Sequence, residues 1–130
     1  MIIIETIGYG GKKPDDFFRE LASMNPGIVV DVRENPYSAF LGIYTLPQLK
    51  KRLGAQYTWI KELGNKTHEL PPTLVDEEVG LGKLRELAMK HGLVVLLCAE
   101  KLEENCHRSY VKKRFQELIA EDEEALSASP

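Results

Sequence analysis

Short apolar runs alternate along this chain with segments in which apolar residues recur every three or four positions. The runs predict β-strands, because β-branched residues favour strands and continuous apolar runs are typical of strands buried on both faces of a sheet. The helical spacing predicts amphipathic α-helices. The predicted strands cover residues 2–7, 28–33, 56–60 and 93–98, and the predicted helices cover residues 14–24, 46–53, 76–91 and 105–123.

Strands that alternate with helices are typical of a mostly parallel sheet with right-handed crossover connections. The expected fold class is therefore α/β: a single three-layer, Rossmann-like domain with a mostly parallel sheet of about four strands. A length of 130 residues fits one domain. We expect this domain to span residues 1–123 and residues 124–130 to form a frayed C-terminal tail.

The composition narrows the class of protein. Hydrophobic residues make up 43% and charged residues 28% of the chain, and the net charge of −3 argues against a protein that coats nucleic acid through general electrostatics. Two cysteines are too few for a disulfide framework, and the N-terminal residues do not resemble a signal peptide. The longest apolar stretch, residues 93–99, is too short to cross a membrane. We predict a cytoplasmic protein with no membrane partner; the sequence leaves the oligomeric state open.

Polar clusters lie at the ends of two of the predicted strands and at the start of the last predicted helix. The carboxyl ends of parallel strands meet at one edge of the sheet, where open α/β folds bind their ligands. We therefore expect the clusters to form one shared site that is acidic, basic and thiol-bearing. The clusters are Asp31-Val32-Arg33, Cys98-Ala99-Glu100 and Cys106-His107-Arg108.

The charged residues of these clusters have two interpretations each. Asp31 and Arg33 are two positions apart on a strand and point to the same face. They form either an acid and an anion-binding guanidinium at the mouth of the site or a structural pair that closes the strand. Arg108 lies at a helix N-terminus, where free N–H groups and the helix dipole favour phosphate or carboxylate. A salt bridge from Arg108 to Asp31 or Glu100 is the alternative.

The remaining candidates are nucleophiles and proton carriers. His107 is a candidate acid or base near neutral pH, with a capping or packing role as the alternative. Cys98 is either a nucleophile activated by nearby positive charge or a small buried hydrophobe. Glu104 stands where the Cys-x5-Arg loop of thiol phosphatases and rhodanese-like proteins would place an arginine, which argues against a cysteinyl-phosphate or persulfide mechanism. His68, in a long loop at residues 61–73, is a candidate for closing over the site.

The sulfur and imidazole groups also raise the question of a metal. The candidate zinc ligands are Cys98, Cys106 and His107, with His68 as a further candidate. They match no common zinc spacing, and Cys106 and His107 are neighbours on a helix, where side chains diverge. The sequence therefore predicts no metal ligands and no cofactor. A metal-binding or thiol-redox protein, with a reversible disulfide between Cys98 and Cys106, is kept as an alternative function.

Five short motifs occur in an order that resembles the domain of unknown function 488 family. They are Thr6-Ile7-Gly8, Asp31-Val32-Arg33, Leu63-Gly64-Asn65, Cys98-Ala99-Glu100 and Cys106-His107-Arg108. The resemblance spans about residues 4–118. It implies a single α/β domain of the kind found in chiefly prokaryotic proteins, with no settled activity. The motif residues carried over by position are Asp31, Arg33, Cys98, Glu100, Cys106, His107 and Arg108. Many relatives carry histidine and serine where this chain has Tyr9 and Gly10.

The favoured hypothesis is a small enzyme that acts on a nucleotide or another phosphorylated substrate. In it, Arg33 and Arg108 hold the anion beside Cys106. Asp31 or Glu100 is the base, His107 the acid or orienting group, and Cys98 a further catalytic candidate. The alternative is a non-catalytic module that binds nucleic acid or another partner, with aromatic side chains that stack on bases. These aromatic residues are Tyr37, Phe40, Tyr44, Tyr57 and Trp59.

Overall fold

A computed structural model describes residues 2–39, 41–100 and 106–128 of the chain. Within these residues, four strands form one parallel sheet: β1 (Ile3–Gly8), β2 (Ile28–Asp31), β3 (Tyr57–Trp59) and β4 (Leu93–Cys98). Their order across the sheet is β1-β4-β2-β3, so the last strand of the sequence lies between the first two. The expected α/β fold with a parallel sheet is confirmed.

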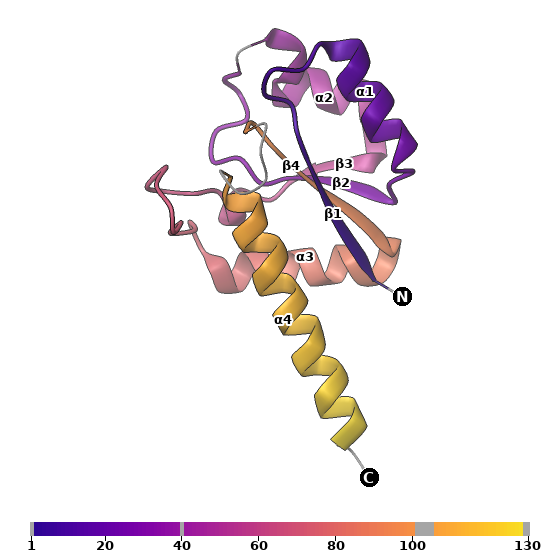
Figure 1. Cartoon of the computed structure of the whole chain (residues 1–130), viewed down its shortest axis with the longest axis vertical. Helices are drawn as coiled ribbons and strands as arrows, with labels where there is room; N and C mark the ends of the chain where they lie inside the picture. The colour runs from indigo at the N-terminus through magenta and orange to yellow at the C-terminus, as the bar shows by residue number, and fades with distance from the viewer. Residues whose placement is uncertain (1, 40, 101–105, 129–130) are drawn as a thin grey trace.

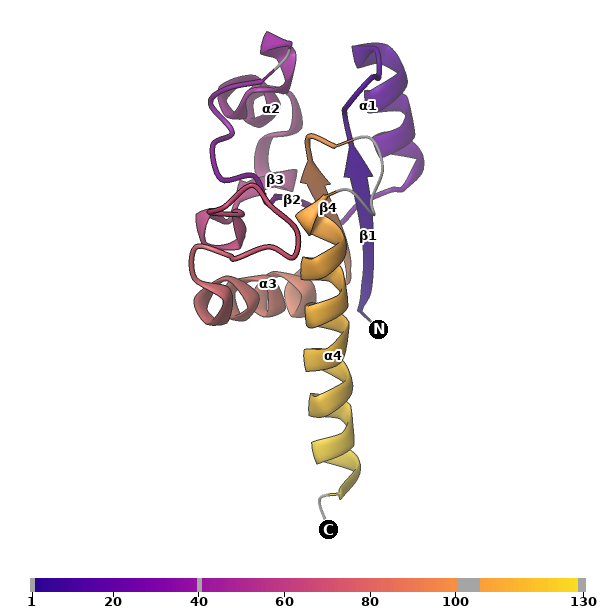
Figure 2. The same ribbon diagram turned by 60° about the vertical axis from the view of Figure 1, so that its left-hand side comes forward.

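Helices cover both faces of this sheet (Figure 1, Figure 2). Helices α1 (Pro14–Ser23) and α2 (Leu46–Leu53) lie on one face, and α3 (Glu77–His91) and α4 (His107–Ala128) lie on the other. The connections from β1 to β2 and from β2 to β3 cross the sheet in one direction, whereas the connection from β3 to β4 returns. Because crossover connections are right-handed, a reversal of direction places α3 on the opposite face from α1 and α2.

Strand β4 contributes alternate side chains to two separate cores. Val95 and Leu97 belong to the same apolar cluster as Phe17 of α1, whereas Leu96 belongs to the cluster that contains Phe115 of α4. All five side chains have no exposed surface. A strand that is buried on both faces requires an uninterrupted apolar sequence, which explains the composition of residues 93–98.

Two predicted boundaries are corrected. Strand β2 ends at Asp31 rather than at residue 33, because the Asp31 carboxylate accepts the backbone N–H of Arg33 over 3.1 Å and turns the chain out of the sheet. Helix α4 continues to Ala128, past the predicted end at residue 123, and its last turns extend beyond the sheet in both views (Figure 1, Figure 2). The predicted start of this helix at residue 105 lies outside the described residues.

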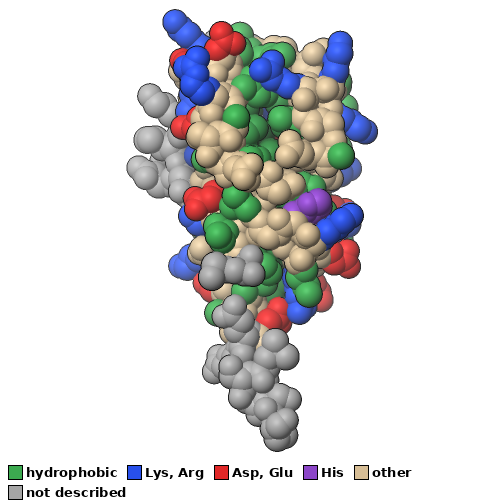
Figure 3. Space-filling view, turned by 90° about the vertical axis from the view of Figure 1, so that its right-hand side faces the viewer, with side chains coloured by type: hydrophobic (Ala, Val, Ile, Leu, Met, Phe, Trp, Pro, Cys, Tyr) green, Lys and Arg blue, Asp and Glu red, His purple; other side chains and the backbone are tan. Residues whose placement is uncertain are grey.

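Among the described residues, no helix is long and apolar enough to span a membrane. On the face drawn in Figure 3, positive and negative side chains are interspersed rather than gathered by sign. This distribution matches the small net charge of −3.

Candidate functional site

A buried ion pair lies at the carboxyl end of β2. Asp31 has no exposed surface, and Arg33 is 5% exposed. Arg33 Nε and Nη2 donate to the two carboxylate oxygens of Asp31 over 2.8 and 2.6 Å. This bidentate geometry offsets part of the cost of burying both charges. Asp31 therefore forms the structural pair that was one of its two predicted interpretations.

Two tyrosines complete this network. The Tyr57 hydroxyl donates to Asp31 Oδ2 over 2.5 Å, and Arg33 Nη1 donates to the Tyr9 hydroxyl over 3.2 Å. Burial raises the pKa of Tyr57, and the charge of Asp31 raises it further, so the phenol stays protonated. Burial acts to lower the pKa of Arg33, but the hydrogen bonds and charge of Asp31 outweigh it and the pKa is raised. Arg33 is therefore a permanent cation.

A cluster of two thiols and one imidazole lies at the carboxyl end of β4. Cys98 is the last residue of β4, Cys106 directly precedes α4, and His107 begins α4. His107 Nδ1 lies 3.8 Å from Cys98 Sγ and 3.9 Å from Cys106 Sγ, and all three residues are buried. Because Cys106 precedes the helix, its side chain converges with that of His107. This corrects the expectation that the two neighbours diverge.

One backbone carbonyl determines where the His107 ring carries its hydrogen. His107 Nε2 lies 2.6 Å from the carbonyl oxygen of Val32. A carbonyl oxygen can only accept, so Nε2 bears the hydrogen and donates it. In the neutral ring the lone pair is then on Nδ1, which faces both sulfur atoms.

The two thiols differ in acidity. A hydrogen bond from Cys98 lowers the pKa of Cys106, and the His107 side chain and the backbone N–H of Arg108 lower it further, although burial acts in the opposite direction. The hydrogen bond to Cys106 raises the pKa of Cys98, and burial adds to this effect. The pKa of Cys106 is therefore lower than that of Cys98, and Cys106 is the more readily ionised of the two thiols. A thiolate is the form of cysteine that attacks substrates and binds metals.

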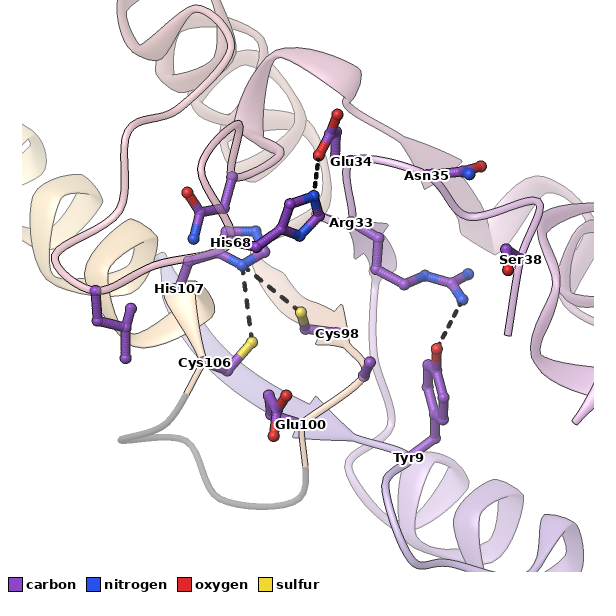
Figure 4. Close-up of a pocket in the computed structure, with 13 residues that line it drawn as sticks. Tyr9, Arg33, Glu34, Asn35, Ser38, His68, Cys98, Glu100, Cys106 and His107 are labelled. Atoms are coloured by element: carbon purple, nitrogen blue, oxygen red, sulfur yellow. Dashed lines mark hydrogen bonds and ion pairs between the residues drawn. The ribbon is translucent and has the colours of Figure 1, made fainter. Parts of the chain in front are cut away.

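The network around Arg33 and the cluster of two thiols and one imidazole border the same pocket, which has a volume of about 260 Å³ and lies at the carboxyl edge of the sheet (Figure 4). Arg33 and Tyr9 lie on one side of the pocket, and the cluster of Cys98, Cys106 and His107 lies on the other. The side chains of Asn35 and Ser38 extend the Arg33 side, and Glu100 lies below the thiols in Figure 4. The pocket therefore combines hydrogen-bond donors with a thiol and imidazole centre.

A loop at residues 64–73 contributes another part of the pocket wall. Asn65 Oδ1 accepts hydrogen bonds from Thr67 and from the backbone N–H of Thr73, and its amide donates to the carbonyl oxygen of Glu69. Asn65 is itself 7% exposed and lines the pocket. This residue of the Leu63-Gly64-Asn65 motif therefore organises the loop from within.

Gly64 and His68 bring the same loop against the chain that follows β2. A Cβ atom on Gly64 would lie 2.6 Å from the Cα atom of Glu34, so only glycine permits this approach. Four residues later, His68 Nε2 lies 2.7 Å from a carboxylate oxygen of Glu34. The side chains of Glu34 and His68 both line the pocket.

Arg108 joins the ends of β1 and β4. It is 2% exposed, and its Nη1 donates to the carbonyl oxygen of Glu100 over 2.7 Å. A Cβ atom on Gly8 would lie 1.7 Å from that oxygen, which explains the glycine at the end of β1. Arg108 is not among the described residues that line the pocket. The expectation that Arg33 and Arg108 border the same ligand site is therefore corrected.

The structure brings most of the predicted site residues together. The members that line the pocket are Arg33, Cys98, Glu100, Cys106 and His107. Asp31 and Arg108 are the two predicted residues outside the described lining of the pocket. Each makes a hydrogen bond to a residue that lines it: Asp31 to Arg33, and Arg108 to Glu100. Sequence reasoning missed the roles of Tyr9 and Tyr57. Tyr9 follows the Gly8 motif, which was an available signal, whereas no local pattern shows that Tyr57 lies beside Asp31.

Two of the aromatic residues predicted to stack on bases are buried. Tyr44 is 1% and Tyr57 7% exposed, and Trp59 packs edge-on against Tyr37 with 5.7 Å between the ring centroids. Tyr37 is 59% exposed, and Phe40 lies outside the described residues. Tyr37 is therefore the exposed aromatic residue among the described members of this set.

Comparison with known proteins identifies a family. The family described as "Domain of unknown function DUF488" matches residues 13–74 and 73–115. The chain belongs to the DUF488 family. No protein with a curated description and no solved structure gives a significant match. In this DUF488 domain, the first matched segment contains Arg33 and the second contains the cluster of Cys98, Cys106 and His107, so the matched residues include both sides of the pocket.

Proposed function

We propose that this DUF488 domain is an enzyme for a small substrate that carries a carboxylate or phosphate group. The observation that carries the proposal is one pocket with a buried guanidinium on one side and a buried thiol and imidazole cluster on the other. The pocket lies at the carboxyl edge of the sheet, where open α/β folds bind ligands. A volume of about 260 Å³ suits a small molecule better than a polymer.

The proposed anion-binding wall consists of Arg33 and Tyr9. Hydrogen bonds to Asp31 and Tyr9 use three N–H groups of the guanidinium, which leaves two of its five for a ligand. The Tyr9 hydroxyl accepts from Arg33, so its own hydrogen is available to a ligand. Burial raises the pKa of Tyr9, which keeps it a donor. Because Asp31 balances the charge of Arg33, recognition here depends on directed hydrogen bonds.

The proposed reacting end of the pocket is the cluster of Cys98, Cys106 and His107. Since His107 Nε2 donates to the Val32 carbonyl, it is Nδ1 and the two sulfur atoms that face the reacting part of a ligand. Glu100 is exposed and lines the same pocket, and we assign it the role of general base.

A titration with inorganic phosphate tests the anion-binding wall. Tyr9→Phe removes one hydroxyl and keeps the ring stacked on Tyr44, 4.5 Å between centroids. We expect the affinity for phosphate, measured by calorimetry and by amide chemical shifts, to fall about five- to tenfold, the value of one hydrogen bond.

The matched control is Tyr37→Phe, which removes a hydroxyl from a tyrosine that is 59% exposed and does not line the described pocket. Its affinity for phosphate should equal that of the unmodified chain. Equal affinities for the Tyr9→Phe and unmodified proteins would overturn the proposed wall. So would the absence of binding to both phosphate and acetate.

A further inference from the structure

The donor atoms of Cys98, Cys106 and His107 are spaced for a single metal ion. Zinc lies about 2.3 Å from sulfur and about 2.0 Å from imidazole nitrogen, so tetrahedral angles place the two donors about 3.5 Å apart. In this chain, His107 Nδ1 lies 3.8 and 3.9 Å from the two sulfur atoms, and all three donor atoms lie within 4.8 Å of one another. Two sulfur atoms bound to one tetrahedral zinc ion lie about 3.8 Å apart, so side-chain movements of at most about 1 Å would bring all three donor atoms within bonding distance of one ion.

The hydrogen bond of the His107 ring supports the same assignment. Ligating histidines in metal sites usually donate their second N–H to a carboxylate or a backbone carbonyl, which orients the ring. His107 Nε2 donates to the carbonyl oxygen of Val32 over 2.6 Å. The lone pair of Nδ1 is thereby directed at Cys98 and Cys106.

The set of donors also indicates which metal and which kind of site. Two cysteine sulfurs and one imidazole suit zinc, and zinc sites with three protein ligands keep the fourth position for water or substrate. Among the described residues, no fourth histidine, cysteine or carboxylate groups with these three. All three line the pocket. We infer that Cys98, Cys106 and His107 bind one zinc ion, with its fourth position open to the pocket.

This inference deepens the proposed function, because it names the reacting centre of the same pocket, but it stands on the geometry of the cluster alone. A zinc ion there would act as a Lewis acid toward a substrate oxygen, opposite the wall formed by Arg33 and Tyr9. The two cysteines would be ligands rather than nucleophiles. Glu100 would lie in the same pocket as a water on the open position.

Metal analysis of the full chain is the first test. We expect elemental analysis to find one zinc ion per chain after zinc is supplied and excess is removed. Replacement by cobalt(II) should give the visible bands of a tetrahedral site and near-ultraviolet charge-transfer absorption from thiolate ligands. A chain that retains no zinc, or a cobalt spectrum without thiolate absorption, would overturn the assignment. This test needs no variant to fold.

Substitutions assign the ligands. Cys98→Ser and Cys106→Ser should each lower the zinc affinity by more than about 100-fold, because loss of a supporting group alone costs 10- to 100-fold. The matched control is His68→Gln, which changes a histidine of the same pocket that is 76% exposed and lies outside the cluster. Its zinc affinity should be unchanged. An equal loss in His68→Gln would overturn the assignment.

The Tyr9→Phe protein separates this inference from the proposed function. We expect it to retain zinc while its affinity for phosphate falls. Absence of zinc together with Tyr9-dependent phosphate binding would overturn the zinc site alone. Zinc bound at the cluster with no binding of phosphate or acetate would overturn the anion-binding wall alone.

Discussion

Asp31 determines both where β2 ends and how Arg33 is held. Its Oδ1 accepts the backbone N–H of Arg33, and both carboxylate oxygens bind the guanidinium that borders the pocket. The Tyr57 hydroxyl supplies a further hydrogen bond over 2.5 Å. Because Asp31 has no exposed surface, water cannot replace a missing donor, and each of these hydrogen bonds stabilises the buried charge.

Tyr57→Phe removes the hydrogen bond to Asp31 and should lower the free energy of unfolding by about 1.5–3 kcal/mol, because a hydrogen bond to a charged group contributes about this much. The ring is retained, so the loss reports on the hydroxyl. Urea unfolding followed by circular dichroism measures it. Tyr37→Phe, at a position 59% exposed, should change the stability by less than about 0.5 kcal/mol. Equal stabilities for the two variants would show that Tyr57 contributes nothing to the Asp31 network.

Helix α3 contains two glycines whose surroundings differ. A Cβ atom on Gly80 would lie 2.6 Å from Cδ2 of Leu63, a side chain with no exposed surface. A Cβ atom on Gly82 would meet no described atom within 4 Å. Gly80 therefore lets α3 approach the turn at Lys61–Leu63, which leads into the loop of the pocket. Gly82 weakens the helix, because glycine is a poor helix former, and no contact explains it.

The same substitution at the two positions tests this difference. Gly82→Ala should raise the free energy of unfolding by about 1 kcal/mol through helix propensity. Gly80→Ala should lower it by about 1–3 kcal/mol, because the added methyl group overpacks the contact with Leu63. Thermal and urea unfolding measure both, and each variant is the control for the other. Stabilisation by both substitutions would contradict the close approach of α3.

The length of α4 shows that packing and helix propensity act separately. The apolar stripe of this helix includes Val111, Phe115 and Ile119, and the sequence analysis placed its end shortly after them. The helix nevertheless continues to Ala128. Residues 121–128 are rich in glutamate, alanine and leucine, which favour helix without tertiary contacts.

At the scale of the whole molecule, the strand order assembles the site. Strand β4 pairs with both β1 and β2, so Cys98 ends between the strand that carries Asp31 and the strand that ends at Gly8. His107 is the first residue of α4, and its ring contacts the carbonyl oxygen of Val32, which lies 75 positions earlier in the chain. The pocket therefore depends on β4 being central.

Amide hydrogen exchange tests this central position. Val94–Leu97 have no exposed surface and lie in a strand with hydrogen-bonded neighbours on both sides, so their amides should exchange most slowly of all strand amides. The three residues of β3 form an edge strand and should exchange fastest among the strands. Exchange measured by NMR in the unmodified chain provides the rates. Equal protection of β3 and β4 would contradict the strand order.

The sequence by itself determined the α/β class, the approximate extent of each strand and helix, and five members of the pocket lining. The class and the elements follow from the periodicity of apolar residues, which is a local property of the chain. The pocket residues follow from polar residues at the ends of the predicted strands, because parallel strands end at one edge of the sheet.

Only the tertiary structure decided that Asp31 pairs with Tyr57, that Arg108 binds the Glu100 carbonyl, and that two thiols converge on His107. The first of these contacts joins residues 26 positions apart. Contacts between distant residues depend on strand order and on the path of each connection, and no local pattern in the sequence encodes either.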